Sequence, residues 1–194
     1  MTTIRVPYGD GWQEAQIPDG VSVQVIDPAC EPVETPVEEL IEEALDHPIG
    51  TPRLEEMVSK QDKVAIIVND HTRPGPNAQL VDALMKRLEA AGVADEQICF
   101  VIATGSHRAS TTAELDKILG EKYRKRIRVR NHDCRDGDHV NIGTTQSGMP
   151  VWIDREVAES SFIITTGLIN PHATAGFSGG RKSIVPGVAG IETL

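Results

Sequence analysis

The chain has 194 residues, of which 39% are hydrophobic and 25% are charged, and its formal net charge at pH 7 is −10. This composition is typical of a globular protein, and the length is sufficient for a domain with its own hydrophobic core. The net negative charge argues against nucleic acid or an anionic membrane as the main partner, because both bind cationic surfaces.

The first 36 residues predict a small β region. Two short alternating segments around a Gly-Asp-Gly turn predict a β-hairpin over residues 3–18, and alternating Val and Ile predict a third strand over 21–28. A Pro-rich connector follows. Apolar residues at helical spacing then predict a helix over 36–48, capped by Thr35, and a shorter helix over 52–60.

From residue 63 onward, apolar runs alternate with amphipathic segments. The continuous apolar runs predict strands buried on both faces, as in a parallel sheet, over 63–70, 97–105 and 160–167. Helices are predicted over 77–92 and 111–120. Shorter extended segments are expected at 127–132, 139–145 and 149–154, and the start of a helix is expected at 189–194.

This order of elements predicts an α/β core over residues 37–194, with a mostly parallel, Rossmann-like sheet and helices on both faces. The hairpin and strand of residues 1–36 precede this core, and 1–194 together are interpreted as one domain with a small appendage. A basic run at 122–130 is interpreted as a helix end followed by an exposed strand edge, and not as a binding patch.

Cysteine usage and the lack of targeting patterns predict the location of the protein. Cys30, Cys99 and Cys134 are odd in number, far apart and without metal-ligand spacing. The N-terminus lacks a signal-peptide pattern, and no apolar run approaches the roughly 20 residues that cross a bilayer. We therefore expect a protein of the reducing cytoplasm without a membrane partner.

Each of the three strong strands is followed by a polar loop that contains Gly or Pro. In an open α/β sheet such loops meet outside the carboxyl ends of the strands, where ligands bind. We therefore expect eight side chains near one crevice: Asp70, His71, Arg73, His107, Arg108, His172, Arg181 and Lys182. Any one of them could be an ordinary loop residue, but a histidine in each of three loops favours a site. His47 and His132 are expected at the surface.

The residue types in this crevice suit acid–base chemistry on a small anion. Histidine titrates near neutral pH, and two histidines from different loops can face one substrate from opposite sides. Arginine binds a carboxylate through two hydrogen bonds, and Gly-rich loops direct backbone N–H groups at an anion. The sequence therefore predicts a site for a small anionic substrate or a phosphate-bearing cofactor.

The stretch GFSGGRKSIVPG, residues 176–187, is similar to a phosphate-binding loop but does not match a Walker A sequence. That motif requires Gly directly before the Lys, whereas Arg181 precedes Lys182 here. Two interpretations of Lys182 stay open. It is either a nucleophile that carries a covalently bound group or a cation that only binds phosphate.

Three motifs, in the same order along the chain, resemble the N-terminal domain of the nickel-dependent lactate racemase family. They are NDHTRP, ATGSHR and NPHATAGFSGGRKSIVPG, at residues 69–74, 103–108 and 170–187, and the opening RVPYGDG also resembles the start of that family. The resemblance implies a two-domain α/β protein with its active site between the domains. It implies a racemase or epimerase of a small 2-hydroxy acid, with lactate as the default substrate.

The resemblance also implies a cofactor and roles for the site residues. Family members carry a nickel pincer nucleotide, a pyridinium mononucleotide with sulfur-containing arms, tethered through a thioamide to a lysine that matches Lys182. Two histidines that match His107 and His172 act as alternating acid and base while a hydride shuttles between substrate and cofactor. A loop that contacts cofactor and substrate in the family matches Asp70, His71, Thr72 and Arg73. Within this loop, Arg73 is the implied partner of the substrate carboxylate.

In the family, the nickel-ligating histidine and the second domain follow the position that matches Leu194. We therefore expect no metal ligand within these residues, and a fragment that is inactive alone and lacks nickel. The implied partners are the 2-hydroxy acid, cofactor-maturation enzymes and a missing C-terminal domain. A non-catalytic binding module for a mononucleotide or small carboxylic acid is the alternative. A hydrolase that uses His107 and His172, with zinc or without a cofactor, is disfavoured because no His-x-x-x-His spacing is present.

Overall fold

The computed structural model describes residues 1–9, 11–26 and 33–194. The chain forms two compact units, Met1–Glu34 and Thr35–Leu194, and each is described by itself. Within the described ranges, no helix combines the length and the apolar character needed to cross a membrane.

The first unit is a β-hairpin, as predicted. β1 (Thr2–Tyr8) pairs with β2 (Gly11–Ile17) in antiparallel register along its whole length. The third strand predicted over 21–28 is wrong for residues 21–26, which form no strand. Most of their side chains are exposed. Alternating Val and Ile favour a strand only where they pack against a neighbouring strand and a core, and the exposed side chains of residues 21–26 lack that packing. Residues 27–32, which include the start of the Pro-rich connector, lie outside the described residues.

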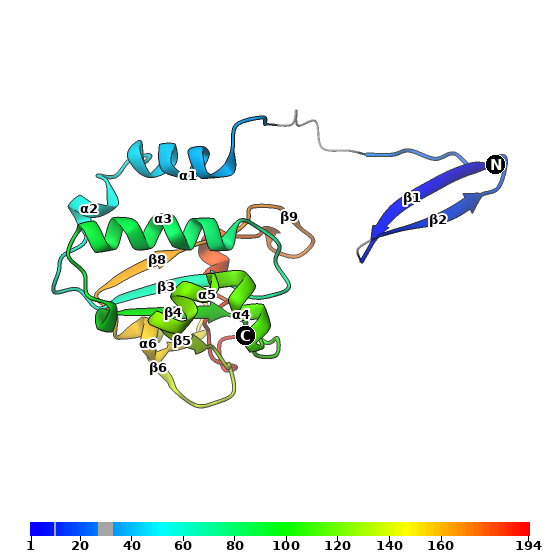
Figure 1. Ribbon diagram of the computed structural model, residues 1–194. Coiled ribbons are helices and arrows are strands. Elements are labelled where there is room, and N and C mark those ends of the chain that lie inside the picture. Colours follow the sequence, from blue (N-terminus) through cyan, green and yellow to red (C-terminus); the bar gives the residue numbers. More distant parts are fainter. Residues whose placement is uncertain (10, 27–32) are drawn as a thin grey trace. The chain divides into compact units, whose positions relative to one another are not determined.

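The second unit contains a four-stranded parallel sheet in the order β5-β4-β3-β8 (Figure 1). Its central strands are β3 (Val64–Asn69) and β4 (Ile98–Ala103), and its outer strands are β5 (Arg128–Asn131) and β8 (Phe162–Thr165). The first five residues of each central strand are buried, as the continuous apolar runs predict. The predicted α/β fold with a parallel sheet is confirmed.

The two outer strands differ in how well the sequence predicted them. β5 follows a helix that ends in basic residues, so the basic run is a helix end and an edge strand, as predicted. β8 was predicted to be buried on both faces, but its residues alternate between half-buried and exposed, and Ile163 is 44% exposed. β8 pairs only with β3 among the described strands, so the apolar run predicted the strand but not its edge position.

Helices cover one face of the sheet. The longest, α3 (Asn77–Ala90), lies along the sheet and is accompanied by shorter helices (Figure 1). Val81, Met85 and Leu88 of α3 are fully buried in the core that this face forms with β3 and β4. Each such side chain contributes about 1.5–3 kcal/mol through burial. The accompanying helices are α1 (Val37–Asp46), α2 (Leu54–Met57), α4 (Thr112–Leu119) and α5 (Glu121–Arg126).

α4 has a capped N-terminus, whereas the cap predicted for α1 is wrong. At α4, the Thr111 hydroxyl accepts from the Glu114 N–H at 3.4 Å, and the Glu114 carboxylate accepts from the Thr111 N–H at 2.7 Å. Thr35 does not cap α1, because that helix starts after Pro36 and has no side-chain cap.

The opposite face has a smaller cover. β6 (His139–Thr144) and β7 (Pro150–Asp154) form an antiparallel hairpin, and the four-residue α6 (Arg155–Ala158) follows it. Side chains of β7 and α6 pack with the C-terminal Val188 and Ala189 against the sheet. Helices on both faces are thus confirmed, although α6 is short. A single-turn 3₁₀ helix, η1 (Asp95–Gln97), precedes β4.

The helix start predicted over 189–194 is wrong, because Ala189 forms an isolated β-bridge with Ile153 and residues 191–193 form a turn. The Thr193 hydroxyl accepts from the Trp152 N–H at 2.7 Å, and the side chain is buried against the β6–β7 hairpin. The segment therefore satisfies its polar groups through tertiary contacts, which local helical propensity does not register.

Candidate active site

Three loops meet at the carboxyl edge of the sheet and line a cavity of about 300 Å³. They follow β3, β4 and β8, as the sequence predicts for an open α/β sheet. Two imidazoles, a carboxylate, a guanidinium and an amine from these loops share the cavity. The residues that carry them are His107, His172, Asp70, Arg73 and Lys182.

His107 is held by a buried carboxylate. Its Nδ1 lies 2.6 Å from Oδ2 of Asp70, a residue that is only 2% exposed. The other carboxylate oxygen of Asp70 accepts from the N–H of Thr72 at 3.1 Å and from its hydroxyl at 2.7 Å. This local turn after β3 is one that Asp favours, and it fixes the carboxylate that orients the His107 ring.

The charge of Asp70 determines which nitrogen of His107 is available. Burial of the Asp70 carboxyl group acts to raise its pKa, but the hydrogen bonds from Thr72 and His107 outweigh burial and lower the pKa below its ordinary value. Asp70 is therefore ionised near neutral pH and can only accept. Because Nδ1 of His107 must then carry a proton, Nε2 is the nitrogen available to a substrate.

His172 lies in a small hairpin that follows β8. β9 (Pro171–His172) pairs antiparallel with β10 (Gly176–Phe177). At the base of the hairpin, the Ser178 N–H donates to the Asn170 carbonyl at 2.8 Å, and the Asn170 N–H donates to the Ser178 hydroxyl at 2.9 Å. Ser178 therefore fixes the strand that carries His172.

The tip of this hairpin is capped by the His172 ring. Nδ1 of His172 accepts from the backbone N–H groups of Thr174 and Ala175, both at 3.3 Å, and also lies 3.3 Å from the Thr174 hydroxyl. The imidazole is thus part of the turn as well as of the cavity wall. Nδ1 is occupied by the protein, and Nε2 is again the nitrogen left for a ligand.

Lys182 lies in a single-turn 3₁₀ helix, η2 (Gly180–Ser183), directly after the Gly-rich segment. Gly179 has a φ of 71°, and a Cβ there would lie 3.1 Å from the Leu168 carbonyl oxygen. Gly167 approaches it equally closely, since a Cβ on Gly167 would lie 3.1 Å from the Gly179 Cα. The glycines therefore allow close backbone packing that brings Lys182 to the cavity.

Gly187 also lines the cavity, and its replacement by Ala is expected to destabilise the second unit. A Cβ at this position would lie 2.3 Å from the Ser183 carbonyl oxygen, an overlap that only backbone movement can relieve. We expect a loss of about 1–3 kcal/mol of unfolding free energy in denaturant titrations. Gln146→Ala, at an exposed position of the same unit, is the control. Equal stability of the two variants would contradict this prediction.

Three candidate residues do not line the cavity. Thr72 acts through Asp70, as described above. Arg108 donates to both carboxylate oxygens of Glu114, at 2.7 and 2.8 Å. Arg181 is exposed and lies outside the lining residues. The sequence placed these residues in the correct loops but could not give the direction of their side chains.

His71 also faces away from the cavity. Its Nδ1 lies 3.2 Å from the Ser110 hydroxyl, and the residue lines a second hollow of about 310 Å³ beside the start of α3. Arg73 lines both the cavity and this hollow. His71 and Arg73 belong to the same loop and share this hollow, but only Arg73 also reaches the cavity.

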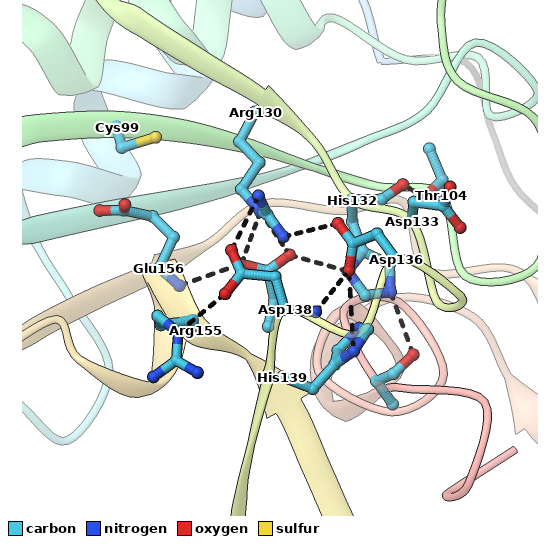
Figure 2. A network of polar contacts seen from close by, with 12 residues as sticks. Cys99, Thr104, Arg130, His132, Asp133, Asp136, Asp138, His139, Arg155 and Glu156 are labelled. Carbon is cyan, nitrogen blue, oxygen red and sulfur yellow. Dashed lines mark hydrogen bonds and ion pairs between the residues drawn. The ribbon is translucent and has the colours of Figure 1, made fainter.

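His132 is buried and not at the surface, contrary to the prediction. Figure 2 shows it within a network of polar contacts. Its Nδ1 lies 2.9 Å from Oδ2 of Asp154, and its Nε2 lies 3.0 Å from the Ala189 carbonyl oxygen. Asp154 also accepts from Nε of Arg130 through both oxygens, at 2.9 and 2.7 Å. Both ring nitrogens of His132 thus lie within hydrogen-bond distance of an oxygen atom.

Thr104 connects this network to the cavity and was missed by the sequence analysis. It is 2% exposed, lines the cavity, and donates its hydroxyl to the His132 carbonyl oxygen at 2.6 Å. Its position directly after β4, inside the ATGSHR motif, was the only signal in the sequence. A Thr in a loop suggests no buried partner 28 residues away.

In the described part of the chain, no group of three or more His, Cys, Asp or Glu side chains is arranged to hold a metal ion. The two described cysteines, Cys99 and Cys134, are buried and free, and Cys30 lies outside the described residues. Burial raises the pKa of the Cys99 thiol to about 11. Cys99 is therefore a neutral core residue and not a nucleophile.

These features define an α/β protein with paired histidines, an arginine and a lysine at the carboxyl edge of a parallel sheet, a class suited to acid–base chemistry on a small anion. Residues 8–194 match the family described as the lactate racemase N-terminal domain, and the chain belongs to this family. The family predicted from the three motifs is thus confirmed.

Two relatives and two solved structures give the extent of this similarity. The chain is 33% identical over its whole length to a lactate racemase of Thermoanaerobacterium thermosaccharolyticum, covering 46% of that protein. It is 39% identical over 77% of its length to a lactate racemase of Lactiplantibacillus plantarum, covering 35% of that protein. The chain therefore spans less than half the length of these curated relatives.

The structure of the lactate racemase apoprotein from T. thermosaccharolyticum superposes with a TM-score of 0.81 at 32% identity, over 99% of this chain and 45% of that one. A protein from Thermotoga maritima superposes with a TM-score of 0.67 at 27% identity, over 80% of this chain and 39% of that one. The fold is thus shared with longer proteins.

Proposed function

We propose that this chain supplies the acid–base and cofactor-tethering half of a racemase or epimerase of a small 2-hydroxy acid, with lactate as the default substrate. One observation carries the proposal: His107, His172, Arg73 and Lys182, from three separate loops, line the same cavity. Membership of the lactate racemase family supports the same reaction class.

Each side chain has a role that its contacts suit. Arg73 binds the substrate carboxylate through its guanidinium, which matches two carboxylate oxygens. His107 accepts the hydroxyl proton at Nε2, and the Asp70 carboxylate at 2.6 Å from Nδ1 stabilises the imidazolium that forms. His172, on the other loop, faces the hydroxyl group of the opposite enantiomer.

The residues present fit a tethered pyridinium mononucleotide. Lys182 offers a primary amine at the cavity, and close glycine packing around Gly179 leaves the backbone of this segment without side-chain bulk. When bound, such a nickel pincer nucleotide would supply an acceptor for the hydrogen on the substrate carbon. A protein ligand to nickel is expected after Leu194, as the family resemblance implies.

The proposed partners follow from the longer relatives. Because the chain covers 46% and 35% of the two lactate racemases, a C-terminal domain is expected to complete the site and to exclude water from it. Maturation enzymes that build and attach the cofactor are the other expected partners, in the cytoplasm. Without them, and without the second domain, we expect no racemisation.

The tether gives a direct test. Full-length protein made together with active maturation enzymes is expected to show, by intact mass and peptide mapping, a covalent adduct on Lys182. Lys182→Arg keeps the positive charge but cannot form a thioamide, so it is expected to show no adduct. Lys86→Arg, on the exposed surface of α3, is the matched control and is expected to keep the adduct. Unmodified Lys182 in the wild type would contradict the tether.

A non-catalytic binding module for a mononucleotide or small carboxylic acid is the second candidate. The cavity with Arg73 and Lys182 favours it as much as it favours the enzyme, because binding needs only the cations. It predicts that a full-length protein with the adduct still fails to interconvert lactate enantiomers in a polarimetric or enzyme-coupled assay. Racemisation would exclude it.

A further inference from the structure

The His172 ring nitrogen Nδ1 faces hydrogen-bond donors. The N–H groups of Thr174 and Ala175 approach it at 3.3 Å, and a backbone N–H can only donate. Nδ1 must therefore present a lone pair. In the neutral ring, the proton is then on Nε2, and that nitrogen acts as a hydrogen-bond donor.

His107 is in the opposite situation. Its Nδ1 faces a carboxylate oxygen of Asp70 at 2.6 Å, and an ionised carboxylate can only accept. The proton of the neutral His107 ring is therefore on Nδ1, and Nε2 presents a lone pair. The two histidines of one cavity are thus held as opposite tautomers by contacts from their own loops.

We propose that Asp70 and the turn of Thr174 are positioning elements that hold His107 as a proton acceptor and His172 as a hydrogen-bond donor in the resting site. This inference rests on the proposed function, since it gives the two histidines their order of action on a 2-hydroxy acid. His107 is ready to accept a proton at Nε2. His172 cannot accept one there, because Nε2 already carries a proton.

The difference has a consequence for the two enantiomers. The substrate whose hydroxyl lies against His107 can lose its proton at once: the O–H bond breaks and leaves its electron pair on the substrate oxygen, the proton forms an N–H bond at Nε2, and Asp70 faces the resulting cation. For the other enantiomer, His172 must first release its Nε2 proton to water and take up a proton from water at Nδ1. That requires the N–H groups of Thr174 and Ala175 to leave Nδ1.

The hairpin allows such a release at its tip and not at its base. Ser178 and Asn170 join the base through two hydrogen bonds of 2.8 and 2.9 Å. Residues 173–175 at the tip are exposed, and β9 and β10 contribute only two residues each. A turn of three exposed residues can reorient without disturbing the sheet, so the tip is the element that would exchange the His172 tautomer.

The tautomers can be measured in the protein without cofactor or substrate. Two-bond ¹H–¹⁵N correlation spectra of the ¹⁵N-labelled chain, recorded at about pH 8 where ordinary imidazoles are neutral, distinguish the Nδ1–H from the Nε2–H form. His107→Gln and His172→Gln each remove one ring and assign its signals. We expect Nδ1–H for His107 and Nε2–H for His172. The same tautomer for both rings would overturn the proposal.

Two variants test the positioning residues. Asp70→Asn offers an amide N–H to Nδ1 of His107 and is expected to shift that ring toward the Nε2–H form. Thr174→Pro removes one of the two N–H donors and is expected to shift His172 toward Nδ1–H, whereas Thr174→Ser keeps the donors and leaves the spectrum unchanged. Unshifted tautomers in a folded Asp70→Asn or Thr174→Pro variant would contradict the assignment. If Thr174→Pro does not fold, the wild-type and Thr174→Ser spectra decide, since a changed His172 signal in Thr174→Ser also contradicts it.

The loaded full-length enzyme gives a kinetic test. Because the two enantiomers are equal in free energy, their kcat/KM values must be equal, and the asymmetry appears instead in the first turnover or in the separate kcat and KM values. We expect different first-turnover rates for the two enantiomers, and equal rates would overturn the order of action. An adduct-bearing protein with the expected tautomers but no turnover would instead contradict the proposed function.

Discussion

Replacement of His107 by Gln in the cofactor-loaded, full-length protein is expected to lower the racemisation rate by roughly 10²- to 10⁴-fold, the usual contribution of a general base. Gln has no titratable nitrogen and cannot accept the hydroxyl proton. The Asp70 carboxylate, 2% exposed, would remain ionised beside an amide that forms no cation. The measurement is the rate of lactate enantiomer interconversion at saturating substrate, with adduct occupancy checked by intact mass.

His47→Gln is the matched control for this prediction. His47 is exposed at the end of α1, and its Nδ1 lies 3.3 Å from the Glu43 carbonyl oxygen, away from the cavity. It is expected to keep the wild-type rate. A loss at His107 that also appears at His47 would indicate a general effect on the protein, and a His107→Gln enzyme within threefold of wild type would remove His107 from the catalytic role.

The three loops of the site could be predicted because each follows a strong sequence signal. The runs VAIIV, ICFVI and FIIT are recognisable as strands from apolar continuity alone, and parallel strands place their carboxyl ends at one edge. Once the strands are known, His107, His172, Arg73 and Lys182 need no further information to be brought near one cavity. The positions of these residues along the chain were therefore sufficient to predict most of the residues that line the cavity.

The directions of side chains could not be predicted in the same way. His71 and Arg73 are two residues apart, yet only Arg73 lines the cavity. His132 looked like a solvated residue at a strand end, but its partners Asp154 and Ala189 are 22 and 57 residues away. Tertiary partners of this kind leave no local pattern, because the periodicity of a sequence reports only which face of an element is apolar.

The predictions for residues 189–194 and for the burial of β8 were wrong for a related reason. An apolar run predicts a strand whether or not a second strand lies beside it, so the exposure of Ile163 at the sheet edge was not visible in the sequence. At residues 189–194, the helical appearance of a short segment was overridden by hydrogen bonds such as that from the Trp152 N–H to Thr193.

Asp154→Asn is expected to destabilise the second unit by about 3 kcal/mol or more. The Asp154 side chain is fully buried and is the only partner of Nδ1 of His132 among the described residues. It also binds Arg130 through both oxygens. Removing one member of a buried ion network leaves the other charges without compensation, at a cost of about 3–5 kcal/mol. The measurement is the denaturant midpoint at unchanged m-value.

Asp138→Asn is the control for this variant. Its carboxylate accepts from Nε of Arg155 at 2.7 Å and lies 3.3 Å from Nη1 of Arg130, but its side chain is 44% exposed. An exposed pair of this kind is worth at most about 1 kcal/mol. Equal losses for Asp154→Asn and Asp138→Asn would show that burial of the network does not determine its contribution.

The pH dependence of the unfolding free energy distinguishes the electrostatic contribution of Asp154 from its contribution to packing. Burial acts to raise the pKa of this carboxyl group, but the hydrogen bonds from His132 and Arg130 outweigh burial and lower the pKa below its ordinary value of 3.8. A group whose pKa is depressed in the folded state stabilises the fold above its unfolded pKa and loses that contribution as the pH falls through the folded pKa. The difference in unfolding free energy between wild type and Asp154→Asn is therefore expected to be complete at pH 7 and to shrink below about pH 4, because protonation then removes the same charge from the wild type. A difference that stays constant on acidification would assign the loss to packing around the amide. The charges of the ion network would then not contribute to the stability of the second unit.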